Sequence, residues 1–150
     1  MARHRRMGTS FYQRHSLSIV SIALLFLWIG LYSHSDPHTH LGALFGNAIA
    51  DWTGVVVTVL GTKFFYEKGS AESRKPRREP RNHFRRIMKD HSLIAFLLLT
   101  GAVWVSLYFK VDAENKWGSV VGNIVSEWTQ VIGLVLLTKR LTEQHSKESK

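Results

Sequence analysis

The 150-residue chain contains no cysteine, so no disulfide can form and the cysteine content indicates no redox compartment. It contains only three prolines, and two of them, Pro76 and Pro80, interrupt one charged segment. Common enzyme motifs are also missing: there is no G-x-S-x-G, no H-E-x-x-H, no P-loop and no glycine-rich dinucleotide fingerprint. We therefore predict a protein without enzymatic activity and without a cofactor.

Charged side chains are scarce in four long apolar stretches, at residues 16–33, 41–61, 92–109 and 117–138. Asp51 and Glu127 are their only acidic or basic residues. A helix rises about 1.5 Å per residue, so spans of roughly 18–24 residues cover the ~30 Å hydrocarbon core of a bilayer, some of them only just. The sequence thus predicts an all-α membrane protein with four transmembrane helices. We place them near residues 16–33, 42–65, 92–110 and 117–139.

Basic residues are distributed unevenly around these spans. They are abundant in the arm at 1–15, in the linker at 66–91 and in the tail at 140–150. By contrast, the two short loops between spans, at 34–40 and 110–116, contain only Lys110 and Lys116. By the positive-inside rule, the arm, the linker and the tail should lie in the cytoplasm, around a multi-pass protein of the cell membrane. The net charge of +9 then favours anionic lipids rather than nucleic acid, because no nucleic-acid-binding module accompanies it.

The first span follows Arg3, Arg5, Arg6 and Arg14, as the apolar core of a signal peptide follows basic residues. It is long for such a core, and no A-x-A-like cleavage site follows it. We therefore expect this span to remain in the mature protein.

The linker changes character after its two prolines. In NHFRRIMKDH, three apolar residues, Phe84, Ile87 and Met88, alternate with basic ones, which suits a short amphipathic helix on the inner leaflet. A solvated connector that only fixes the topology fits the same pattern equally well. The candidate contacts with anionic lipid are Arg77, Arg78, Arg81, Arg85, Arg86 and Lys89.

The two halves of the chain align without a gap when one is shifted by 76 residues. Trp28 then aligns with Trp104, and the segment SAES after the second span aligns with SKES after the fourth. Other identities join Gly42, Gly46, Asn47, Trp52, Thr53, Thr62 and Lys63 to Gly118, Gly122, Asn123, Trp128, Thr129, Thr138 and Lys139. Apolar composition alone does not match Trp, Asn and Lys in register, so the pattern predicts a tandem duplication.

Each predicted unit, at 16–65 and at 92–139, contains two spans, so both units should insert in the same orientation. A pseudo-twofold axis along the membrane normal would then relate them and bring equivalent residues face to face. Asp51 and Glu127 are the first candidates for such a pair.

A mainly polar stripe runs at helical spacing along the second span and along the fourth, where Leu134 interrupts it. The stripes contain Asn47, Asp51, Gly54, Thr58 and Thr62, and Asn123, Glu127, Gln130, Leu134 and Thr138. Beside them run small residues whose spacing favours close helix packing in lipid, and on which a homo-oligomer could assemble. These are Gly42, Gly46, Ala50, Gly118, Gly122 and Ser126.

Both acids fall near mid-membrane, where a charge costs about 2.5–3.5 kcal/mol on insertion scales and should face protein, water or a partner. If they face each other, repulsion and desolvation would keep at least one of them protonated. Two hypotheses follow. In the first, the acids hold the bundle or an oligomer together through hydrogen bonds, in a non-transporting accessory subunit that recruits a partner. Alternatively, they line a path for protons or cations, with Asn and Thr oxygens as further ligands.

The outer loop HSDPHTH gathers His34, Asp36, His38 and His40, residue types that bind zinc, copper or nickel. The aligned loop of the second half has no histidine, so an ordinary polar turn explains the pattern as well.

The fourth span reads Asn123, Ser126, Glu127, Trp128 and Gln130, and GSAESRK at 69–75 follows the second. This N-x-x-S-[DE]-[WF]-x-Q helix with G-S-x-E-S-K resembles a family of small bacterial integral membrane proteins classed as a domain of unknown function. Ala50 and Gly54 depart from that pattern in the first half. The resemblance implies a location in the bacterial cytoplasmic membrane and supplies no activity.

Overall fold

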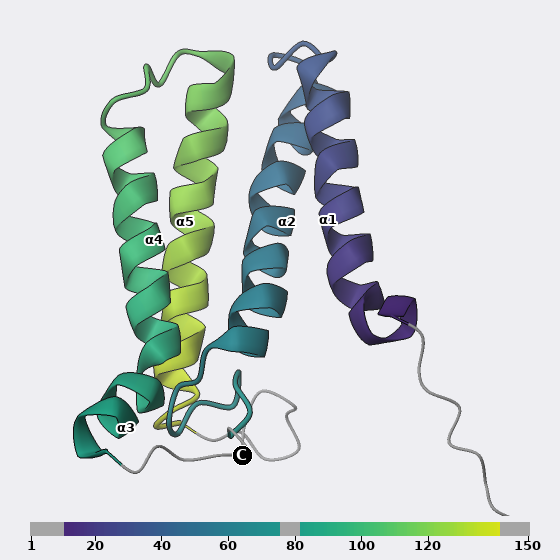
Figure 1. The fold of residues 1–150 in the computed structure, drawn as a ribbon. Helices are drawn as coiled ribbons and strands as arrows, with labels where there is room; N and C mark the ends of the chain where they lie inside the picture. The colour runs from purple at the N-terminus through teal and green to yellow at the C-terminus, as the bar shows by residue number, and fades with distance from the viewer. Residues whose placement is uncertain (1–10, 76–81, 142–150) are drawn as a thin grey trace, which may run out of the picture.

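The computed structural model describes residues 11–75 and 82–141, and they form five helices. The helices are α1 (Phe11–Ser33), α2 (His40–Phe64), α3 (His83–Asp90), α4 (Ser92–Tyr108) and α5 (Lys116–Leu137). The all-helical fold predicted from the sequence is therefore confirmed. The short helix α3 lies at one end of the bundle that the other four form (Figure 1).

Polar side chains fix where three of the helices begin. Thr39, Asn82 and Asn115 each have extended backbone at the N-cap of α2, α3 and α5, and each side chain accepts a hydrogen bond from an amide of the first turn. By contrast, α1 begins at Phe11, five residues before the expected start at 16. The apolar run marks the stretch that can lie in lipid, and the helix extends beyond that stretch into more polar residues.

Three helices are long and apolar enough to cross a membrane: the part of α1 from His15 to Ser33, α2 and α5. This indicates a multi-pass membrane protein. The fourth expected span, α4, is apolar but has 17 residues, which corresponds to about 26 Å against a hydrocarbon core of about 30 Å. It ends at Tyr108, whereas the sequence pattern predicted about 110.

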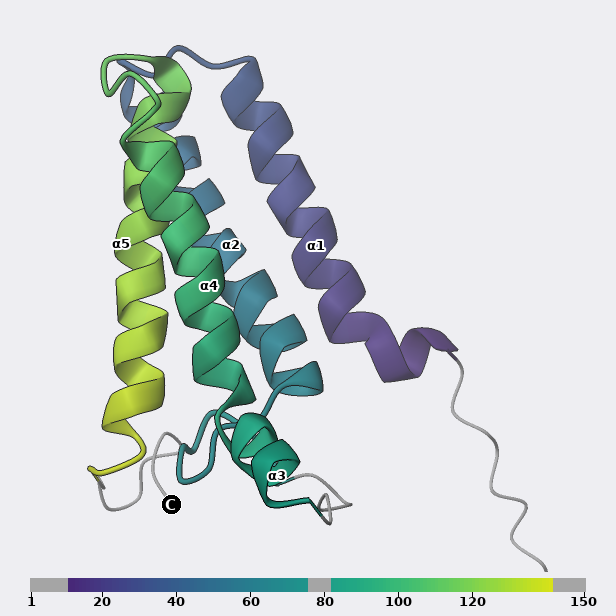
Figure 2. The same ribbon diagram turned by 60° about the vertical axis from the view of Figure 1, so that its left-hand side comes forward.

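The helices pack side by side in the order α1, α2, α5, α4 (Figures 1 and 2). The two helices that carry the acids are therefore central, and α1 and α4 lie on their outer flanks. The main buried cluster joins α1, α2 and α5 through Tyr32, Ile49, Ala50, Val120, Ile124 and Trp128. A smaller cluster of Leu93, Leu97 and Val135 joins α4 to α5.

The small residues do not all pack helix against helix as predicted. A Cβ on Gly42 would lie 1.9 Å from the carbonyl oxygen of Asp36, and one on Gly118 would lie 2.0 Å from that of Asp112. Each of these two glycines therefore lets the preceding loop fold onto the first turn of its helix, which corrects the prediction of a helix–helix role. Ser126 is exposed, so it has no packing role in the chain either.

The other three small residues do lie against neighbours. Gly46 packs against the Tyr32 ring and Gly122 against the Tyr108 ring, while Ala50 is 1% exposed in the main cluster. Tyr32 and Tyr108 therefore occupy grooves that only a glycine leaves open, and each joins an outer helix to a central one.

Candidate functional site

The two carboxyl groups meet at the middle of the central helix pair. Asp51 is about 17 Å along α2 from His40, and Glu127 is about 17 Å along α5 from Lys116, by the rise of 1.5 Å per residue. Both side chains line one cavity at the α2–α5 contact. The Glu127 side chain lies over buried Gly54, where a Cβ would be 3.5 Å from its Oε2 atom.

A second polar pair reinforces this contact one helical turn away. The Asn123 side-chain amide donates a hydrogen bond of 2.6 Å to Asn47 Oδ1. Like the two acids, these asparagines are 76 residues apart in the sequence. Two successive pairs of matching positions therefore lie face to face between α2 and α5.

Around the acids lies a cavity of about 450 Å³. Gln130 lines it and donates a 3.1 Å hydrogen bond to Glu127 Oε1, and Thr58 adds a hydroxyl group. The remaining walls are mostly aliphatic, formed by Val55, Val59, Val131 and Leu134. The cavity thus combines two carboxyl groups, an amide and a hydroxyl in an apolar setting.

This cavity opens on the surface of the chain. Asp51 and Gln130 are exposed, as are Val55 and Leu134, each with 41% of its surface accessible. A mid-span carboxyl group in direct contact with hydrocarbon is costly, so in a bilayer this face requires protein or water over it.

Two threonines predicted for the stripe lie outside this cavity. The Thr62 hydroxyl donates to the Thr58 carbonyl oxygen, and Thr138 shares a 3.0 Å hydrogen bond with the Ser70 hydroxyl. Thr138 therefore belongs to a polar network at the end of α5, which corrects its place in the predicted path.

The metal site predicted in the outer loop is not formed. Across residues 11–75 and 82–141, no group of three or more His, Asp or Glu side chains is arranged to hold a metal ion, so His34, Asp36, His38 and His40 do not converge. Asp36 instead accepts a 2.9 Å hydrogen bond from the His38 amide and so shapes the turn.

Three of the six predicted lipid contacts, Arg77, Arg78 and Arg81, lie outside the described residues. The other three, Arg85, Arg86 and Lys89, belong to α3. The apolar side chains of this helix are exposed: Phe84 by 70%, Ile87 by 48% and Met88 by 62%.

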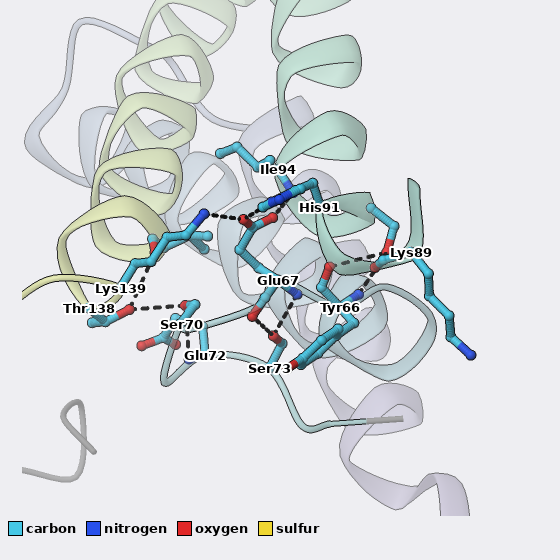
Figure 3. A network of polar contacts seen from close by, with 12 residues as sticks. Tyr66, Glu67, Ser70, Glu72, Ser73, Lys89, His91, Ile94, Thr138 and Lys139 are labelled. Atoms are coloured by element: carbon cyan, nitrogen blue, oxygen red, sulfur yellow. Dashed lines mark hydrogen bonds and ion pairs between the residues drawn. The ribbon is translucent and has the colours of Figure 1, made fainter. Parts of the chain in front are cut away.

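The sequence interpretation missed Glu67, the most buried charged residue in the described part of the chain, which is 0% exposed just beyond α2. Figure 3 shows Lys139 and His91 pointing at its carboxylate, with the Lys139 Nζ and His91 Nδ1 atoms each 2.7 Å from Glu67 Oε1. Its other oxygen, Oε2, accepts a 3.4 Å hydrogen bond from the amide of Ile94. Partners from the ends of α4 and α5 therefore surround this carboxylate.

The carboxylate also completes the first turn of α4, whose N-cap residue His91 makes no side-chain capping bond. The amide of Leu93 donates to the Tyr66 carbonyl oxygen, and the amide of Ile94 to Glu67. A helix start leaves such amides unpaired and carries partial positive charge, so a buried anion is stabilised there. The segment after α2 thereby fastens the first half of the chain to the second.

The rest of this segment is held equally closely. Ser70 is buried against Thr138, and the Ser73 hydroxyl bonds to both the amide and the carbonyl oxygen of Glu67. Gly69 has φ of +95°, and a Cβ there would lie 3.1 Å from Lys139 Cγ. The repeated S-x-E-S element and the repeated Thr-Lys pair were the sequence signals that could have pointed to this network.

No protein-family model, no curated protein and no solved structure matches the chain. The resemblance to the family of bacterial membrane proteins therefore stays a prediction.

Proposed function

We propose that the protein conducts protons or cations across the cell membrane through the contact between α2 and α5. The observation that carries this proposal is the meeting of Asp51 and Glu127 in one cavity, halfway along two helices that are long and apolar enough to span a bilayer. Ionisable groups at that depth are costly and typically mark an ion or proton pathway.

The cavity offers suitable chemistry for this activity. Two carboxyl groups that line one cavity can hold a proton and pass it on, as carboxyl groups do in membrane proton relays. The Gln130 amide and the Thr58 hydroxyl add oxygen ligands, which hard cations prefer. The proposal includes no catalytic step.

The proposed topology has four spans, with both termini and the linker in the cytoplasm. It counts α4 as a span because α4 packs along α5 and is apolar throughout its 17 residues. Its length falls short of the hydrocarbon core by only a few ångströms, which local thinning of the bilayer accommodates at a cost of fractions of a kcal/mol per Å. The exposed apolar face of α3 would then rest on the inner leaflet, with Arg85 and Arg86 near anionic headgroups.

A second copy of the chain is part of the proposal. Because Asp51 and Gln130 are exposed, a single copy would present them to lipid. Two copies with these faces together would enclose the carboxyl groups in a polar interior. The proposed conducting form is therefore a homo-oligomer.

The test is ion flux into liposomes that contain the purified protein, with protons, K⁺, Na⁺ and divalent cations assayed separately. The variant Asp51→Asn/Glu127→Gln should lose the flux. A matched control is Asp112→Asn/Glu114→Gln, which makes the same two chemical changes in an exposed outer loop and should conduct like the native chain.

Flux that is lost only in the mid-span variant, with its oligomeric state intact in detergent, would support the proposal. The proposal fails if native protein gives no flux above empty liposomes. In that case, loss of the oligomer in the mid-span variant would identify the acids as a structural contact in a non-transporting subunit.

A further inference from the structure

Three cavities follow one another along α2. The first is the central cavity, which holds the two mid-span acids. The second, the narrow cavity, has a volume of about 30 Å³ and shares Thr58 and Leu134 with the first. The third, the end cavity, lies at the end of the bundle that carries α3 and shares Thr62 and Glu72 with the second (Figure 1). Consecutive cavities therefore share walls from the middle of the span to the end of the bundle.

Oxygen-bearing side chains mark each step of this series. Thr58 is seven residues after Asp51, and Thr62 is four residues further on, so the steps along α2 are about 10 Å and 6 Å. The Thr62 hydroxyl donates a 2.6 Å hydrogen bond to the Thr58 carbonyl oxygen. Its own oxygen can therefore still accept a hydrogen bond from water. Glu72 continues the series just beyond the end of the helix.

The segment after α2 holds Glu72 in this position. The Glu72 amide donates a 3.2 Å hydrogen bond to the Ser70 hydroxyl, which in turn bonds to Thr138 of the second half (Figure 3). On the other side of Glu72, the Ser73 hydroxyl bonds to the backbone of Glu67. The half-buried Glu72 side chain is thus fixed on the walls of both the narrow and the end cavity.

The size of the narrow cavity restricts what can pass. Its apolar walls include the buried side chains of Leu93, Leu97 and Val135. A volume of about 30 Å³ has room for about two water molecules, at roughly 10–15 Å³ each. A metal cation would have to lose most of its hydration shell to enter, whereas a proton can move along hydrogen-bonded water. The narrow cavity therefore favours protons over metal cations.

The charge of the end cavity favours the same ion. Lys63 and Arg74 line it, together with His15, whose Nδ1 atom lies 2.8 Å from Lys63 Nζ. Of the described residues around this cavity, Glu72 is the only acid. A mouth with two permanent positive charges repels metal cations. A proton can instead enter by binding to the Glu72 carboxylate, and so does not have to cross the mouth as a free ion.

We propose that the conducted ion is the proton, and that Glu72 relays it between bulk water at the α3 end and the mid-span acids. This inference rests on the proposed function and names its ion and one entrance. A proton from bulk water binds a Glu72 carboxylate oxygen, and Glu72 then releases it to water in the narrow cavity. Water passes it on to the carboxyl groups of Asp51 and Glu127. Each transfer breaks one O–H bond and forms another, so no further reactant is needed.

The test is proton flux into liposomes that contain the purified protein, followed with an enclosed pH-sensitive dye. Glu72→Gln should reduce the flux about tenfold or more, because a positioned acid–base group typically contributes at least that factor. Glu72→Asp keeps a carboxyl group and should retain most of the flux. The matched control Glu114→Gln makes the same change as Glu72→Gln in an exposed outer loop and should conduct like the native chain.

The absence of native cysteine allows a carboxylate to be restored at this one position. In Glu72→Cys, iodoacetate alkylates the thiolate with loss of iodide and leaves a carboxymethyl group, whereas iodoacetamide leaves a neutral group of the same size. Both reactions are carried out before reconstitution. Flux should return after iodoacetate and stay low after iodoacetamide. Equal flux after the two reagents would overturn the relay, because a purely structural role does not require the charge.

A second variant leaves the segment after α2 untouched. Thr62→Val removes the hydroxyl acceptor from the narrow cavity and should lower proton flux severalfold. Its control is Thr129→Val, because the exposed Thr129 hydroxyl also donates to a backbone carbonyl of its own helix. Equal flux in these two variants would contradict a path through the narrow cavity.

The outcomes separate this inference from the proposed function. Proton flux that is lost in Asp51→Asn/Glu127→Gln but native in Glu72→Gln would overturn the relay and leave the proposed function intact. Flux of K⁺, Na⁺ or divalent cations through the native protein would overturn the choice of ion and also leave the proposed function intact. No flux of any ion through the native protein would overturn both.

Discussion

Replacing Glu67 with glutamine should destabilise the fold, because the carboxylate is fully buried and joins three groups from α4 and α5. Removing one partner of a buried ion pair costs about 3–5 kcal/mol. The side chains of Lys139 and His91 are 29% and 47% exposed, so water can partly solvate them after the loss. The side-chain amide of the new glutamine can also keep part of the hydrogen bonding that the Glu67 carboxylate makes. We therefore expect a cost of about 2–3 kcal/mol.

At roughly 2–4 °C per kcal/mol for a chain of this size, the melting temperature should fall by about 4–12 °C. The measurement is thermal unfolding in detergent micelles, followed by circular dichroism. Glu114→Gln makes the same change on an exposed loop and should shift stability by no more than about 0.5 kcal/mol. A double-mutant cycle between Glu67→Gln and Lys139→Met should give a coupling energy within about 0.5–3 kcal/mol. If Glu67→Gln melts like the Glu114 control and the coupling is zero, the reasoning about this network is wrong.

Two further stability predictions use the same unfolding assay. Gly42→Ala should cost about 1–3 kcal/mol, because its Cβ would lie 1.9 Å from the Asp36 carbonyl oxygen. The control Gly30→Ala, with no atom within 4 Å, should be neutral or stabilising by up to about 1 kcal/mol, and equal effects of the two changes would contradict the close loop contact. Thr100→Val should cost about 1–3 kcal/mol because it removes the 3.0 Å acceptor of the Trp128 indole N–H, a ring that is 3% exposed. A Thr100→Ser variant should keep most of that stability, and a loss as large as that of valine would show that the hydroxyl is not the important group.

Much of the candidate site followed from sequence spacing. Helical periodicity placed Asp51 and Glu127 on stripes with Asn47 and Asn123; in the structure the two asparagines are hydrogen-bonded and the two acids line one cavity between α2 and α5. Periodicity failed at the stripe ends, because it takes no account of where a helix stops. Thr138 follows the last residue of α5, so its hydroxyl bonds to the neighbouring loop rather than to the cavity.

The small residues show a different limit of the same reasoning. Spacing identifies a row of small side chains on one helix face but not what lies against it. Gly42 has the spacing of a helix-packing residue, yet the closest atom to its Cβ position belongs to the backbone of the preceding loop. Gly46, one turn later, does pack against another helix. Only the path of the loop decides between the two roles.

The sequence alone determined the features that depend on neighbours along the chain. Apolar runs fixed which segments could be helices in lipid, and N-cap residues such as Thr39 and Asn115 fixed where two of them begin. The tertiary structure decided the meaning of Glu67. In the sequence it is one acid at the start of a basic linker, and its partners His91 and Lys139 are 24 and 72 residues away. Burial and charge compensation arise only when α4 and α5 close around that carboxylate, because both depend on distances in space.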